Sequence, residues 1–323
     1  MTRRPRLLLL LASLALAGLA VAQTAPAPEQ SIQAPLAPSS LLLDVSRVGS
    51  AVVAVGERGH ILISQDGGAS WKQADVPTRS TLTSVHFQGP NLGLAVGHDA
   101  VIVRTTDGGA SWQRVHWDPD AEAPLLDVLF VDGNRAFAVG AYGSSLVTTD
   151  GGASWADSPV AEDDFHLNQI ARSASGRLYI AAESGIAYRS DDGGASWTEL
   201  ETPYEGSFFG VLPLENDVVL LFGLRGHLFR SEDAGASWIP VETETVAMLN
   251  SGIRLPDGRI IIVGLGGVVL VSTDGGRSFA LRQQETRLGI QALADAGGNR
   301  LVLSGEGGVR QLALNELSDG KDR

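Results

Sequence analysis

The octapeptide Ser64-Gln-Asp-Gly-Gly-Ala-Ser-Trp71 decides the fold, because the chain repeats it six times. The shared aspartates are Asp66, Asp107, Asp150, Asp192, Asp233 and Asp274, and successive copies lie 41, 43, 42, 41 and 41 residues apart. A period of about 40–50 residues is typical of propellers and solenoids. Five copies end in Trp71, Trp112, Trp155, Trp197 and Trp238, and the sixth ends in Phe279.

A second signal lies eight to ten residues before each box aspartate. It is a small-x-x-small turn that starts at Gly56, Gly97, Gly140, Ala182, Gly223, Gly264 and Gly305. Short runs rich in Val, Ile and Leu flank these turns and predict strands. Each repeat therefore predicts four strands, a to d: the turn joins b to c, the octapeptide joins c to d, and d starts at the aromatic residue. Seven turns predict an all-β, seven-bladed propeller over residues 31–314.

The seventh repeat has no octapeptide, so it lacks a strand d of its own. We expect residues 31–35 to supply this strand by pairing with residues 309–314, which would tie both ends of the chain into one sheet. Residues 315–323 are then a polar C-terminal tail.

The N-terminus has the pattern of an export signal. Three arginines (Arg3, Arg4 and Arg6) precede an apolar run over residues 7–21, and Ala20-Val21-Ala22 offers small residues at a cleavage position. We interpret residues 1–22 as a signal peptide, with an uncleaved membrane anchor as the alternative. Residues 23–30 are a Pro-rich leader. The expected location is the periplasm or the exterior, or the thylakoid lumen if the source is photosynthetic.

Composition excludes several function classes. The 323 residues include no Cys, which excludes disulfides, thiol catalysis and thiolate metal sites. The 24 basic and 37 acidic residues give a net charge of −13, and loss of residues 1–22 would change it to −16. Such acidity argues against a nucleic-acid partner. We expect a monomer without a membrane span after cleavage.

The complete period resembles a known family. The octapeptide is the Asp-box or BNR repeat, and the combination Val55-Gly56…Gly59…Ile61…Asp66-Gly67-Gly68…Trp71 is similar to blades of the Ycf48/Hcf136-like photosystem II assembly factors. Val96-Gly97…Asp107 and Val139-Gly140…Asp150 match as well, and the resemblance covers about residues 41–314. It implies an exported, seven-bladed, non-enzymatic chaperone that holds subunits of a membrane complex. Members also occur in non-photosynthetic bacteria.

The Asp-box residues themselves are expected to be structural. The carboxylate can accept hydrogen bonds from its own turn, the following glycine permits positive φ, and the aromatic ring can cover the hairpin. A catalytic or calcium site would not be repeated in every blade. Arg104, Arg189 and Arg230 share one position three residues before the box aspartate, where we expect pairing with nearby acids.

The sequence contains no catalytic motif. The phosphate-binding, nucleophile-elbow and zinc-protease patterns are absent, and no two of the six histidines have short metal-ligand spacing. We therefore predict no enzyme activity, no metal and no cofactor. The alternative is a sialidase-like glycoside hydrolase or a periplasmic ligand-binding propeller. The absent F-R-I-P segment and the uniform loop lengths weigh against it.

The face formed by the b–c turns and the d–a loops is the candidate site for a protein partner, because both kinds of loop surround one mouth of the central channel. Arg and aromatic residues dominate interface energetics. The candidates are Arg58, Arg79, His98, Tyr142, His166, Tyr204, Phe208, Arg225 and Arg287, with His60, Asp99, Glu183, Phe209 and His227 nearby. Trp117, outside any box, is a further possible anchor.

Overall fold

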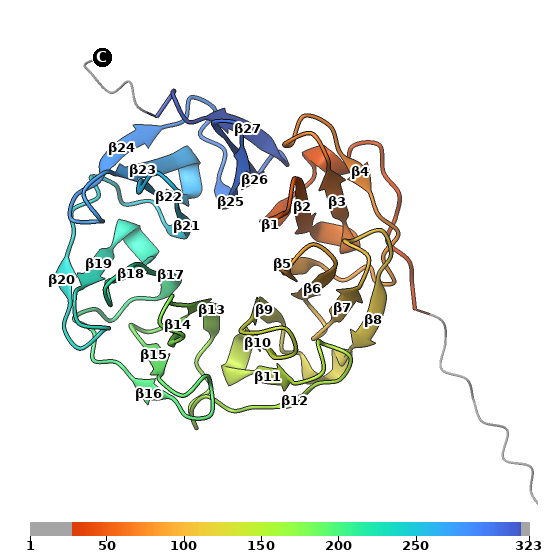
Figure 1. The fold of residues 1–323 in the computed structure, drawn as a ribbon, viewed down its shortest axis with the longest axis horizontal. Coiled ribbons are helices and arrows are strands. Elements are labelled where there is room, and N and C mark those ends of the chain that lie inside the picture. The colour runs from red at the N-terminus through yellow and green to blue at the C-terminus, as the bar shows by residue number, and fades with distance from the viewer. Residues whose placement is uncertain (1–27, 318–323) are drawn as a thin grey trace, which may run out of the picture.

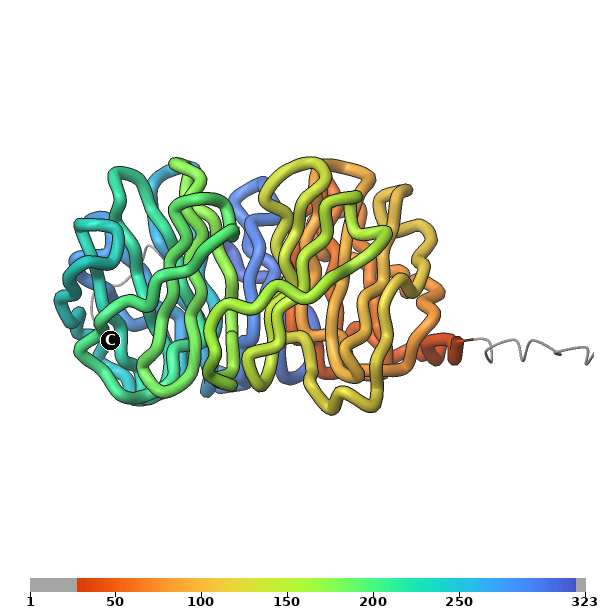
Figure 2. Tube along the Cα trace, turned by 90° about the horizontal axis from the view of Figure 1, so that it is seen from below, coloured from red at the N-terminus to blue at the C-terminus, as the bar shows by residue number. Residues whose placement is uncertain are grey.

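Consecutive strands of each repeat pair in chain order as one antiparallel sheet, and seven such sheets stand around a central channel (Figure 1). This computed structural model describes residues 28–317. Viewed edge-on, the molecule is a flattened ring in which the sheets stand side by side (Figure 2). The seven-bladed, all-β propeller predicted from the repeat is confirmed.

Six blades contain four strands and the seventh contains three within the described residues. Their bounds, blade by blade, are β1 (Leu42–Val48), β2 (Ala51–Gly56), β3 (Ile61–Ser64) and β4 (Lys72–Gln73); β5 (Leu82–Gln88), β6 (Leu92–Gly97), β7 (Ile102–Thr105) and β8 (Gln113–His116); β9 (Leu125–Phe130), β10 (Ala136–Gly140), β11 (Ser145–Thr148) and β12 (Ala156–Asp157); β13 (Leu167–Arg172), β14 (Leu178–Ala182), β15 (Ala187–Ser190) and β16 (Thr198–Glu199); β17 (Phe208–Pro213), β18 (Val219–Gly223), β19 (Leu228–Ser231) and β20 (Ile239–Pro240); β21 (Leu249–Arg254), β22 (Ile260–Gly264), β23 (Val268–Ser272) and β24 (Ala280–Gln283); and β25 (Ile290–Gly297), β26 (Arg300–Gly305) and β27 (Arg310–Ala313).

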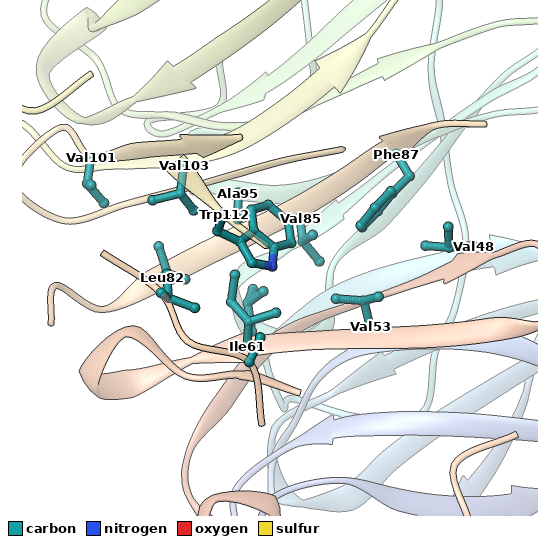
Figure 3. Close-up of a cluster of buried hydrophobic side chains, with 13 residues drawn as sticks. Val48, Val53, Ile61, Leu82, Val85, Phe87, Ala95, Val101, Val103 and Trp112 are labelled. Atoms are coloured by element: carbon teal, nitrogen blue, oxygen red, sulfur yellow. The ribbon is translucent and has the colours of Figure 1, made fainter. Parts of the chain in front are cut away.

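The core lies between neighbouring blades. Strand b of a blade is covered on both faces, so β2, β10, β14, β18 and β22 bury every residue, which explains their continuous apolar sequences. Figure 3 shows the layer between blades one and two, where Val53 and Ile61 meet Leu82, Phe87 and Trp112. The rings of Phe87 and Trp112 contact edge to face at 6.1 Å. Stacked sheets of this kind hold the ring together.

The structure corrects the predicted closing strand. Residues 31–35 form no strand and do not pair with β27. They lie along the outer edge of blade one, where Ser31 exchanges hydrogen bonds with Val76 (2.8 and 3.1 Å) and Gln73 bonds the main chain of Ile32 and Ala34 (2.9 and 3.0 Å). We call residues 29–37 the strap. These hydrogen bonds hold residues 31–34 at blade one, away from the edge of β27.

The strap still contributes to ring closure through packing. Ala37 is buried, and Ala34 packs beside it, in the cluster that joins blade one to Ala292 and Val302 of blade seven. The main chain of Val309 also donates to the carbonyl of Pro38 at 3.0 Å.

Strand c of blade seven is displaced by one residue relative to the other blades. In blade one, Val55 precedes the turn glycine and pairs with Ile61, but in blade seven Leu303 pairs with Arg310 where Ser304 would be expected. A one-residue shift turns every side chain to the opposite face. As a result Leu312 and Leu314 enter the core beside blade six, and Gln311 faces blade one.

This shift completes a set of bonds between blades. Arg104, Arg189 and Arg230 each donate to a carbonyl in the next blade's Asp-box, at Gly151, Ala234 and Gly275 (2.7–3.0 Å). Gln311 donates to Gly67 at 2.8 Å and so makes the same bond across the closure. The predicted acid partners occur for Arg189 and Arg230, with Asp191 and Glu232, but the bond to the next blade is what the three arginines share.

The C-terminal boundary also differs from the expectation. Leu317 is buried in the cluster between blades six and seven, so residues 315–317 belong to the packed body and not to a tail. The predicted signal peptide and residues 318–323 lie outside the described residues.

Candidate protein-binding face

The b–c turns share one geometry. Their third residue, counted from the glycine or alanine that starts the turn, has left-handed backbone angles in every blade, with φ between 53° and 73°, at Arg58, Asp99, Tyr142, Ser184, Arg225, Gly266 and Gly307. This conformation costs a residue with a side chain about 1–2 kcal/mol, and glycine adopts it freely. Five blades nevertheless carry a side chain there, and all five side chains are exposed. The turns therefore present a ring of side chains at positions where the backbone alone would favour glycine.

Seven equivalent hydrogen bonds hold these turns in place. The second turn residue donates its N–H to the carbonyl just before strand a of the same blade, at 2.9–3.1 Å: Glu57 to Leu41, His98 to Thr81, Ala141 to Pro124, Glu183 to His166, Leu224 to Ser207, Leu265 to Met248 and Glu306 to Gly289. The same bond therefore tethers the turn to strand a in every blade.

Two aromatic pairs bridge turns and d–a loops. The rings of Tyr142 and His166 pack edge to face with their centres 4.9 Å apart, and the ring centres of Tyr204 and His227 are 4.4 Å apart. The Tyr204 hydroxyl donates to the carbonyl of Leu224 at 3.1 Å. Tyr142 remains 61% exposed, which leaves its ring available to a partner.

The mouth of the channel is lined by a β-bulge at the start of each strand a. The bulges leave one extra residue per blade pointing to the channel: Leu43, Thr83, Leu126, Asn168, Phe209, Asn250 and Gln291. These residues enclose a cavity of about 310 Å³. The sequence analysis did not predict this ring. A large apolar residue starts each strand a at the spacing of the repeat, and the residue after it is the one that faces the channel. This pattern is the signal that could have found the ring.

Side chains beside the bulges bind neighbouring blades. Asp44 accepts the N–H of Val85 in blade two at 2.8 Å, Asp127 accepts that of Ile170 in blade four at 2.8 Å, and Gln169 accepts that of Val211 in blade five at 2.7 Å. The Ser84 hydroxyl lies 3.1 Å from Asp44 and 2.7 Å from Asp127. It has one hydrogen and can donate to only one carboxylate at a time.

Burial changes the pKa of three side chains on strands a, Asp44, His86 and Asp127. It raises the pKa of Asp127 to about 7, against the hydrogen bonds from Ser84 and Ile170, and it raises the pKa of Asp44. Burial also lowers the pKa of His86 to about 4. Neutral His86 accepts the Phe130 N–H through Nδ1 at 3.2 Å.

Most predicted face residues reach the surface, and two do not. Arg58, Arg79, His98, Tyr142, Arg225 and Arg287 are exposed, and His166 and Tyr204 are half-buried. Phe208 is 0% exposed because it enters the core between blades four and five, so it is wrong as a binding residue, and Phe209 lines the channel instead. His60 is also buried. Trp117 is 47% exposed, with the Arg114 guanidinium 4.5 Å from its ring centre.

The Asp-boxes lie at the opposite end of the strands from the b–c turns. In the first box, Asp66 accepts the hydroxyls of Ser64 and Ser70 (2.7 and 2.6 Å) and the Ser70 N–H (2.9 Å). The Trp71 indole donates to the carbonyl of Gly68 at 3.1 Å. The hydrogen bonds from Ser70 and Ser64 hold the pKa of Asp66 well below its usual range. The carboxylate is thus saturated by its own hairpin.

Within residues 28–317, no group of three or more His, Asp or Glu side chains is placed to hold a metal ion. The same part of the chain contains no helix long and apolar enough to cross a membrane.

Comparison with known proteins identifies the family. The model of the family described as "Photosynthesis system II assembly factor YCF48" matches residues 23–121 and 117–320. This chain belongs to the YCF48 family. No curated protein sequence matches the chain.

Solved structures agree on the fold. A structure described as YCF48 bound to D1 peptide has a TM-score of 0.69 and 20% identity, and the match covers 90% of this chain and 98% of that one. YCF48 from Cyanidioschyzon merolae has the same score and identity, with 90% and 99% covered. The WD40 propeller of Doa1 also has a TM-score of 0.69 at 13% identity, with 88% and 96% covered.

Proposed function

We propose that this YCF48 family member is an exported, non-enzymatic, monomeric propeller that binds a polypeptide segment of a membrane protein complex and assists its assembly. The ring of exposed side chains in left-handed turns carries the proposal. Strained backbone positions cluster at ligand-binding and active sites, and the glycines Gly266 and Gly307 show that the turn can form without a side chain at this position. Arg58, Tyr142 and Arg225 are therefore the first residues to test.

Two further observations support this face. The seven hydrogen-bonded tethers keep the turns in place, so a partner would pay little entropy to order them. A structure similar to this chain is described as YCF48 bound to D1 peptide, so a polypeptide is the first class of ligand to test. The sialidase-like alternative is not favoured, because the chain matches the model of an assembly-factor family over nearly all of its length.

The test is capture of partners from membrane extracts of the source organism. The mature chain should retain a reproducible membrane-protein subunit, and the double variant Tyr142→Ala/Arg225→Ala should weaken binding at least about tenfold, the loss expected for two hot-spot residues. Thr106→Ala, an exposed Asp-box residue at the opposite face, is the matched control. Equal loss in the control would refute the assignment of the face. Turnover of sialoside substrates, with no retained subunit, would instead support the hydrolase.

A further inference from the structure

His60 is a buried histidine whose ring has no hydrogen-bond partner among residues 28–317. It follows the b–c turn of blade one and is 1% exposed, and neither ring nitrogen bonds a described residue. A neutral imidazole always carries one N–H donor and one acceptor nitrogen. Burying both without partners costs stability, so a histidine at this place requires an explanation.

The repeat does not require a histidine at this position. Blades two, six and seven have Val101, Val268 and Val309 there, four residues after the start of the turn. Blade five has His227, but its side chain is exposed. Valine therefore suits the position, and the enclosed histidine is particular to blade one, the blade along which the strap lies.

The strap lies next to the His60 ring. The carbonyl of Ile32 in the strap acts to raise the pKa of His60, but this carbonyl already accepts the Gln73 amide at 2.9 Å. Burial has the larger effect and lowers the pKa of His60 from its ordinary value. The charged groups that act on the ring are Glu57 and Arg58, and their effects have opposite signs. Enclosure beneath the strap therefore disfavours the protonated ring.

A few hydrogen bonds hold this part of the strap to blade one. They join the Ser31 N–H to the Val76 carbonyl (2.8 Å), the Ala34 N–H to the Gln73 side chain (3.0 Å) and the Gln33 amide to the Asp75 carboxylate (2.7 Å). The next segment is anchored separately, because Ala37 is buried in the core between blades one and seven. Residues 29–34 can therefore detach without opening the ring.

The same part of the strap occupies Arg79, a residue of the candidate protein-binding face. The Arg79 Nε–H donates to the carbonyl of Gln30 at 3.0 Å, and its guanidinium pairs with the carboxylate of Glu29 at 3.4 Å. An arginine binds a partner carboxylate through these same N–H groups. A partner at Arg79 must therefore displace the strap.

We propose that His60 is a pH-sensitive latch, whose protonation releases residues 29–34 of the strap from blade one and frees Arg79. A charged imidazole beneath the strap has neither partners nor water, and release of the strap gives it water. Because the enclosed ring has a pKa below the ordinary 6.5, the strap is held at higher pH and is progressively released as the pH falls below about 6.5. The latch concerns this chain alone, whereas the use of Arg79 by a partner rests on the proposed function.

Hydrogen exchange of the strap amides in the full mature chain tests the latch. Between about pH 7.5 and pH 5, the protection factors of the Ser31 and Ala34 N–H groups, corrected for the intrinsic pH dependence of exchange, should fall about threefold or more. The Arg79 Nε–H should lose protection with them. The Leu200 N–H, which bonds the carbonyl of Ala187 in blade four at 2.8 Å, is the internal control and should stay protected.

Substitutions identify the group that senses pH. His60→Val introduces the residue that three other blades have at this position, and it should abolish the pH dependence. His60→Gln, which keeps a polar side chain that does not titrate, should do the same. His227→Val changes the equivalent histidine of blade five and is the matched control. It should retain the pH dependence, as should Glu29→Gln and Asp75→Asn, which remove acids that contact the strap or belong to it.

Several results would overturn the proposal. Protection that does not change with pH would do so, as would an equal fall in both His60 variants. Loss of the pH dependence in Glu29→Gln or Asp75→Asn would assign the switch to that acid instead. A parallel loss at Leu200 would mean that the whole ring opens and not the strap alone. None of these measurements needs a partner, so failure here is separable from failure of the proposed protein-binding face.

Discussion

Asp66 lies on the surface, yet its hairpin supplies every hydrogen bond that its carboxylate accepts. We expect Asp66→Asn to lower Tm by roughly 2–4 °C in a chain of this size, because the amide cannot accept the same set of N–H and O–H donors. Thermal unfolding of this variant is compared with Asp163→Asn, an exposed aspartate in a d–a loop. Partner binding should not change. A variant that loses binding while keeping its Tm would contradict a structural role for the box.

Asp127 and His86 make opposite contributions to pH dependence. Asp127 has a raised pKa of about 7, so its contribution to stability falls as pH rises from about 4 to 7. His86 has a pKa lowered to about 4 from 6.5, so its contribution rises with pH over that interval. The two partly cancel in the wild type.

We therefore expect Asp127→Asn, which mimics the protonated acid, to gain stability relative to the wild type as pH increases from 4.5 to 8. Its own stability should rise to about pH 6.5 and then level off, because the His86 contribution remains. Urea unfolding at pH 4.5, 6.5 and 8 measures both curves. Parallel curves for the two proteins would mean that Asp127 is ionised throughout.

At the scale of one element, a glycine in the b–c turn can be needed for either of two reasons: its φ angle is positive, or a Cβ has no space. Gly226 and Gly266 have similar φ angles of 74° and 66°, but a Cβ at Gly226 would lie 2.1 Å from the carbonyl of Thr245, while Gly266 has open space. We expect Gly266→Ala to cost about 1 kcal/mol, from backbone strain alone. Gly226→Ala should cost at least about 2 kcal/mol more, because the turn must move away from the d–a loop. If urea unfolding shows the same loss of unfolding free energy for both variants, the d–a loop moves away from the added Cβ at no cost.

At the scale of the whole molecule, the strap joins the first blade to the last. Removal of residues 23–37 should lower Tm by several degrees, because it exposes the cluster around Ala37 and deletes the bonds to Gln73 and Val76. Removal of residues 23–28 alone is the control and should have little effect. If both truncations have the same Tm, the strap does not stabilise the ring.

The sequence by itself determined the fold, the number of blades and the end of the ring that carries the candidate site. The reason is local: an Asp-box closes its own hairpin, and turns that begin with a glycine or alanine recur at a constant period. The exposure of Arg58, Tyr142 and Arg225 followed from that periodicity, because each lies at the same place in its repeat.

Tertiary structure decided the features that depend on neighbouring blades. Phe208 is buried because the neighbouring blade covers it, and Arg104 bonds the next blade because their sheets stack. The strap lies along blade one because Gln73 and Val76 form hydrogen bonds with it. The register of β27 is set by Leu312 and Leu314, which enter the core beside blade six. These outcomes depend on contacts between residues far apart in the chain. The repeat pattern describes each blade separately, so it does not specify those contacts.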